Sequence, residues 1–236
     1  MSERILRGRV LSFRRRPEGV GDLAALDWHE DGAVHLRDGL IVAMGDFADI
    51  AIPGLPVTDH RPHLISAGFI DTHLHFPQVQ IVASWGAQLM DWLNTYTFPA
   101  ETRYADPAHA ARMATVFYDL LLRNGTTTAS AFCSVHPTSV EAYFAEAEAR
   151  GMRMLGGKVL MDRHAPEALQ DTPQTAYDDS QALIERWHGK GRALYAISPR
   201  FAITSTPAQM EAAGALIARR PDLHVQTHLS ENHDEI

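Results

Sequence analysis

From residue 66 onward, short apolar runs alternate with helix-like segments, and this alternation limits the possible fold more than any other feature of the sequence. Helices are expected at about 107–124, 138–150, 173–188 and 207–219, three of them starting with a capping residue and proline, as at Asp106-Pro107. The strands expected between and around them cover 64–75, 126–131, 152–160, 193–198 and 223–227. Five strands alternating with helices, at about 38 residues per unit, are typical of a parallel β/α architecture.

Residues 1–65 differ from the rest, with short apolar bursts broken by turn signals. The dipeptide Asp38-Gly39 lies between two such bursts and predicts a hairpin. We expect a small β-sheet segment at 1–65 and the β/α region at 66–236. A closed eight-unit barrel needs on the order of 300 residues from its first strand, so the β/α region is expected to be the first five units of a longer protein.

The end of the first predicted strand carries two histidines one residue apart, His73 and His75. Residues i and i+2 of a strand point to the same side, so both imidazoles can reach one metal ion. A bare pair of this kind is also compatible with two unrelated polar histidines. His228 ends the fifth predicted strand, and the carboxyl ends of barrel strands meet at one rim, where catalytic sites form. Three imidazoles with one open position for water are typical of catalytic zinc.

Composition limits the other classes of function. The 236 residues are 45% hydrophobic, as in a globular protein, and carry 21 Lys+Arg against 29 Asp+Glu, a net charge of −8. With no basic cluster larger than Arg14-Arg15-Arg16, nucleic-acid binding is not supported. The single cysteine, Cys133, excludes an internal disulfide and a Cys-rich zinc site. No signal peptide or membrane span is recognisable, and we expect a cytoplasmic protein.

Four sequence blocks resemble a known family. Gly68–His75 resembles the first-strand signature of the amidohydrolase superfamily, and three further blocks resemble its guanine deaminase branch: Asp91–Glu101, Ser198–Phe201 and Thr227–Asn232. The resemblance implies an amidohydrolase-type TIM barrel, with residues 1–65 belonging to a small β-sandwich domain. It also implies one zinc ion per subunit held by His73, His75 and His228, with further ligands beyond Ile236, and a homodimer when full length. The sequence leaves zinc and iron open.

The resemblance also assigns roles around the metal. Glu231, three residues past His228, is expected to move protons between water, the ring and the leaving amine. Gln78, Arg200 and Phe201 are expected to bind the purine: an amide and a guanidinium for its polar edge, and a ring for its face. Trp92 and Phe98 are expected mainly to pack. Without the family context, Glu231 and the three ligand-binding candidates are ordinary loop residues.

The function implied is zinc-dependent conversion of guanine and water to xanthine and ammonia. Two alternatives stay open. A related amidohydrolase acting on a pterin, an s-triazine or another amino-heterocycle needs the same zinc and glutamate. An inactive truncated fragment, with an open barrel edge that binds a partner chain, is the third possibility. In all three cases the 236 residues alone are not expected to deaminate guanine, because the resemblance implies a further metal ligand beyond Ile236.

Overall fold

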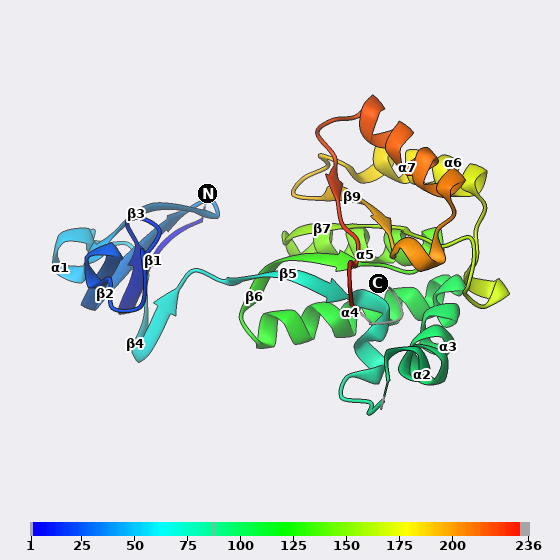
Figure 1. Ribbon diagram of the computed structural model, residues 1–236. Helices are drawn as coiled ribbons and strands as arrows, with labels where there is room; N and C mark the ends of the chain where they lie inside the picture. Colours follow the sequence, from blue (N-terminus) through cyan, green and yellow to red (C-terminus); the bar gives the residue numbers. More distant parts are fainter. Residues whose placement is uncertain (1, 87, 232–236) are drawn as a thin grey trace. The chain divides into compact units, whose positions relative to one another are not determined.

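The computed structural model describes residues 2–86 and 88–231 and divides the chain into two compact units, Met1–Gly68 and Phe69–Ile236 (Figure 1). The first unit is a four-stranded sheet in the order β3-β2-β1-β4. Its strands are β1 (Glu3–Phe13), β2 (Leu26–Arg37), β3 (Leu40–Asp46) and β4 (Val57–Ser66), and the four-residue helix α1 (Phe47–Ile50) follows β3. The described part of this unit is therefore mainly β, as the sequence predicts.

The hairpin at Asp38-Gly39 is confirmed. β2 and β3 pair antiparallel, and the two residues between them have positive φ angles of 50° and 80°. Asparagine, aspartate and glycine are the residues that adopt this region at low cost, and a turn of this hand matches the twist of the two strands. β1 also pairs parallel with β4.

The second unit contains a parallel sheet in the order β10-β9-β7-β6-β5 (Figure 1). Each of these strands neighbours the next in chain order, with a helical connection between them. The strands are β5 (Phe69–His75), β6 (Thr126–Phe132), β7 (Arg153–Gly157), β9 (Leu194–Pro199) and β10 (His224–Val225), and the short β8 (Val159–Leu160) also pairs with β9. This is the order of successive units in a β/α barrel.

The long helices of this unit connect successive strands. They are α4 (Pro107–Arg123), α5 (Pro137–Arg150), α6 (Pro173–Trp187) and α7 (Pro207–Arg219), while α2 (Leu89–Trp92) and α3 (Phe98–Thr102) lie in the long connection after β5. Apolar side chains of the four long helices pack with the strands in one buried cluster. Tyr143 of α5 donates a hydrogen bond of 2.8 Å to the Leu155 carbonyl oxygen of β7, which fixes the helix on the sheet.

Two local expectations differ from the structure. The predicted capping box at Thr138 is wrong: α5 begins at Pro137, and the Thr138 hydroxyl donates to the Tyr104 carbonyl oxygen instead. The single strand expected over 152–160 is interrupted at Lys158, whose buried ammonium pairs with Asp171. In both places a side chain interacts with another segment of the chain, through a hydrogen bond at Thr138 and an ion pair at Lys158, and the local sequence does not reveal these interactions.

None of the helices in the described residues has both the length and the apolar character needed to cross a membrane.

Candidate metal centre and ligand pocket

The carboxyl ends of β5 and β9 and the segment after β10 border one cavity of about 180 Å³. Strands that run parallel end at the same edge of a sheet, so residues distant in sequence meet there. All seven site residues expected from the sequence line this cavity, together with three apolar ones: His73, His75, Gln78, Leu89, Trp92, Leu93, Arg200, Phe201, His228 and Glu231.

The three histidines form a tight cluster. Their possible ligand nitrogens all lie within 4.8 Å of one another, and Nε2 of His75 is 3.0 Å from Nε2 of His228. The ring centroid of His73 lies 5.3 Å from that of His75 and 5.0 Å from that of His228. The alternation of β5 places the first two imidazoles on the same side, and the end of β10 brings the third to meet them.

The surroundings favour the neutral form of His75 and His228 and orient the ring of His228. Nδ1 of His228 lies 2.7 Å from the Arg200 carbonyl oxygen, which can only accept, so Nδ1 carries the proton and Nε2 offers a lone pair. Burial, followed by the positive charge of Arg200, holds the pKa of His75 well below its usual value. Burial also lowers the pKa of His228, against the opposing effects of that carbonyl bond and of the Glu231 carboxylate. A neutral imidazole is the form that binds metal.

This donor set fits a zinc ion. Zinc binds imidazole nitrogen at about 2.0–2.1 Å, so two nitrogens that share one ion must approach each other to roughly 3–3.5 Å, as those of His75 and His228 do. When Nε2 of both residues carries a lone pair, the two nitrogens repel each other at this distance, and an ion bound between them removes the repulsion. Metal binding is therefore the simplest account of their approach.

Phe132, the last residue of β6, packs against all three imidazoles. Its ring centroid lies 4.9 Å from that of His75 and 4.5 Å from that of His228, in stacked orientations, and 5.6 Å from that of His73. The side chain is 1% exposed. Phe132 therefore limits the rotation of the three imidazole rings and shields from water the side of the cluster that it covers. Nothing in the sequence distinguishes this phenylalanine from the others.

Arg200 is buried, although a residue at the rim of a barrel is expected to be exposed. Its guanidinium lies in an ion pair with Glu101 of α3, in which Nη1 donates to Oε1 at 3.0 Å and to Oε2 at 2.8 Å. The Arg200 and Glu101 side chains are 4% and 0% exposed. Nε2 of Gln78 also donates to Oε1 of Glu101, at 3.5 Å. Glu101 thus contacts both polar candidates for ligand binding, and sequence reasoning did not select it.

Glu231 and Phe201 complete the polar and aromatic sides of the cavity. Glu231 is exposed and near enough to His228 for its charge to raise the pKa of that imidazole. Phe201 follows Arg200 directly and is 4% exposed. Trp92, expected mainly to pack, also lines the cavity, whereas Phe98 is buried beneath Arg200, with the guanidinium carbon 5.6 Å from its ring centroid.

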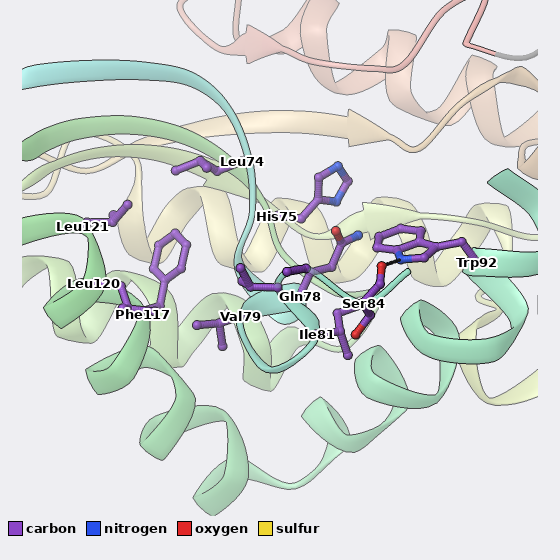
Figure 2. Close-up of a pocket in the computed structure, with 12 residues that line it drawn as sticks. Leu74, His75, Gln78, Val79, Ile81, Ser84, Trp92, Phe117, Leu120 and Leu121 are labelled. Carbon is purple, nitrogen blue, oxygen red and sulfur yellow. Dashed lines mark hydrogen bonds between the residues drawn. The ribbon is translucent and has the colours of Figure 1, made fainter. Parts of the chain in front are cut away.

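A second, more apolar cavity of about 320 Å³ shares His75, Gln78 and Trp92 with the first (Figure 2). Leu74 of β5 and Phe117, Leu120 and Leu121 of α4 line the side away from Gln78 and Trp92. The Trp92 indole N–H donates to the Ser84 carbonyl oxygen at 3.1 Å, drawn as the dashed line in Figure 2. This bond anchors Trp92 where the two cavities adjoin.

A parallel β/α sheet with a histidine cluster at the carboxyl ends of its strands is the arrangement of barrel hydrolases that use a metal. The sequence pattern of the amidohydrolase family matches residues 64–236. The chain belongs to this family.

Among its relatives, the guanine deaminase of Escherichia coli (strain K12) is 47% identical over 235 residues, which is 98% of this chain and 54% of that protein. The solved structure of an E. coli guanine deaminase superposes with a TM-score of 0.94 and 46% identity, covering 99% of this chain and 55% of that one. The chain therefore spans about half the length of the curated relatives it matches, and its fold is that of the N-terminal part of an amidohydrolase barrel.

Two further structures of similar fold contain a bound ligand or metal ion. A guanine deaminase from C. acetobutylicum, with guanine bound in its active site, has a TM-score of 0.83 at 28% identity and covers 100% of this chain and 55% of that one. An adenosine deaminase from Xanthomonas campestris with bound zinc has a TM-score of 0.74 at 23% identity and covers 98% and 50%. The second likeness concerns the fold alone.

Proposed function

We propose that the full-length protein is a zinc-dependent guanine deaminase that converts guanine and water to xanthine and ammonia. The observation that supports this most is the cavity itself. The resemblance assigns seven residues, six of them in three separate blocks and Gln78 just past the first block, and the fold gathers all seven around one space. A guanine deaminase from E. coli and a guanine-bound guanine deaminase from C. acetobutylicum match 98% and 100% of the chain, at 47% and 28% identity, and they support guanine as the substrate.

In this proposal His73, His75 and His228 hold the ion. The metal, when bound, supplies the Lewis-acid activation that makes water a nucleophile at neutral pH. The carbonyl oxygen of Arg200 fixes the tautomer of His228 and so directs its lone pair into the cluster. Phe132 packs beneath the three rings and excludes solvent from that side.

The other residues bind the purine and handle protons. The Arg200 guanidinium donates to the substrate carbonyl oxygen and Gln78 accepts from the adjacent ring N–H, while Phe201 stacks on the ring face. Glu231 takes one proton as water adds to C2 and passes it to the ring nitrogen, and then takes the second proton from the new C2 hydroxyl and passes it to the amine, which leaves as ammonia. The reaction therefore consumes one water molecule and releases one ammonia molecule for each guanine.

The remaining expectations rest on the resemblance and the composition. We propose that residues 1–65 contribute to a β-sandwich domain, that the full-length protein is a cytoplasmic homodimer, and that it binds neither nucleic acid nor membranes. Size-exclusion chromatography with light scattering tests the homodimer directly.

A panel of amino-heterocycles tests the activity. The zinc-loaded full-length protein should release ammonia from guanine and form xanthine at a kcat/KM at least a hundred times that for adenine or an amino-s-triazine without a carbonyl group, because these rings lack the N–H beside C=O edge that both polar groups match. A pterin carries the same edge, so it is the competitor that tests whether the rest of the cavity fits a purine. A preference for another ring would replace guanine as the substrate while keeping the chemistry. No ammonia release from any member of the panel would refute the proposal.

A further inference from the structure

Glu101 is a fully buried carboxylate that touches two lining residues of the cavity and is not itself among the lining residues. Burying a charge is costly unless it is paired, and Arg200 pairs it. A buried ion pair, however, adds little net stability compared with an apolar pair of the same volume. Stability alone therefore does not account for a carboxylate at this position. The carboxylate also affects the orientation of its two partners, Gln78 and Arg200.

The carboxylate determines which way the Gln78 amide faces. A carboxylate only accepts hydrogen bonds, so the group that Gln78 presents to Glu101 has to be its NH₂. The carbonyl oxygen of Gln78 is then directed away from Glu101 and is available as an acceptor to a molecule in the cavity. Without Glu101, the amide has no comparable reason to prefer this orientation.

The same carboxylate fixes Arg200. Both hydrogen bonds to Glu101 come from Nη1, so this one nitrogen anchors the guanidinium, whose carbon lies 5.6 Å from the ring centroid of Phe98. An anchored donor thus lies on the same cavity as the oriented acceptor of Gln78. An acceptor beside a donor is complementary to a ring edge that carries N–H next to C=O, and is mismatched to an amidine edge, where an unprotonated ring nitrogen adjoins an amino group.

We propose that Glu101 is a positioning residue that holds Gln78 and Arg200 as an acceptor–donor pair selective for the lactam edge of a purine. This inference deepens the proposed function and rests on its assignment of the cavity as the substrate site. Glu101 acts through its two partners and does not touch the substrate.

The test is Glu101→Gln in the metal-loaded full-length protein. An amide in place of the carboxylate keeps one accepting oxygen and replaces the other with a donating NH₂ group. Arg200 donates to both Oε1 and Oε2 of Glu101, and Gln78 donates to Oε1, so in either orientation of the amide a donor faces the NH₂ group and one partner must turn or move. The readout is the dissociation constant of hypoxanthine, which has the lactam edge, divided by that of purine, which lacks it, both by calorimetry. A ratio measured on one preparation is independent of the folded fraction.

Asp171→Asn is the matched control. Asp171 forms the other deeply buried ion pair noted above, with Lys158, where the side chains are 6% and 1% exposed. Neither residue lines the cavity. Both variants exchange a buried carboxylate for an amide and both should lower the melting temperature, so any difference between them in the binding ratio reports on the cavity rather than on stability.

We expect wild type to favour hypoxanthine over purine, Glu101→Gln to reduce this preference by about 10–100-fold, and Asp171→Asn to leave it within about twofold. An unchanged preference in Glu101→Gln, equal reductions in both variants, or no preference in wild type would each overturn the inference. These measurements need no turnover: a wild type that fails to deaminate guanine but shows the expected ratios would refute the proposed function and leave the inference standing.

Discussion

Three imidazoles of the cavity lie close enough to share one ion, and each is required if the ion is held as proposed. We predict that the full-length protein binds about one zinc ion per subunit and that His73→Ala or His228→Ala loses it, because a site that lacks one of its histidine ligands binds zinc much more weakly. Metal analysis of the purified proteins measures this. His224→Ala is the control, since His224 is exposed on β10, four residues before His228. Equal zinc in all four proteins would contradict the ligand assignment.

Glu231 lines the same cavity beside His228. We predict that Glu231→Gln retains zinc and guanine binding but reduces kcat by about 10²–10⁴-fold, the range expected when a positioned proton carrier is lost. The substitution is nearly isosteric, so a loss of kcat with unchanged metal content separates proton transfer from ligation. Near-normal turnover would show that another group carries the protons.

Arg200 lies in a buried ion pair, so its removal affects stability as well as binding. We predict that Arg200→Ala lowers the free energy of unfolding by about 3–5 kcal/mol, because the Glu101 carboxylate remains buried and unpaired. Denaturant titration measures this change. The double variant Arg200→Ala/Glu101→Gln should be more stable than Arg200→Ala alone, since the unpaired charge is then gone. A double variant of lower stability would show that the charge is not the cause.

The site residues differ in how far sequence could identify them. His73, His75 and His228 follow from strand periodicity and strand ends, and the ligand-binding candidates follow from the resemblance. Glu101 and Phe132 were missed because their roles depend on contacts across the fold: Glu101 meets Arg200 from 99 positions away. A glutamate at the end of a recognised block gives no local signal that it is buried.

At the scale of elements, the helices were located by their first residues. Asp106 accepts a hydrogen bond from the Ala108 N–H at 2.9 Å at the start of α4, and Thr206 accepts from the Gln209 N–H at 3.3 Å at the start of α7. The same reasoning failed at Thr138, where a distant carbonyl oxygen takes the hydroxyl. Capping rules describe local competition for the backbone, and a tertiary hydrogen bond can override them.

This difference can be measured. We predict that Asp106→Ala lowers the free energy of unfolding by about 1 kcal/mol, the usual cost of losing an N-terminal cap. Asp106→Asn should restore most of the loss, because the amide oxygen can accept the same hydrogen bond. Denaturant midpoints of the three proteins decide the point. A loss of similar size in Asp106→Asn would indicate that the carboxylate charge, rather than the hydrogen bond, stabilises the start of α4.

At the scale of the molecule, the parallel sheet of the second unit is open. Among the described residues, β5 and β10 are its two edges, and both carry exposed apolar side chains: Phe69 is 65% exposed, Ile70 is 70% exposed and Val225 is 52% exposed. In a closed barrel the first and last strands pair with each other, so such edges are covered. The sequence predicted this arrangement from the number of β/α units and their length.

An isolated open sheet should be neither fully stable nor active. We predict that residues 1–236 expressed alone associate through the apolar edges, bind a hydrophobic dye and release no ammonia from guanine, because exposed strands pair with other chains and the resemblance places further metal ligands beyond Ile236. Size-exclusion chromatography, dye fluorescence and an ammonia assay at saturating zinc measure the three effects. The full-length protein is the positive control for the assay. Association without activity is the expected result, whereas zinc-dependent deamination by the 236 residues would show that His73, His75 and His228, with Glu231, suffice for the chemistry.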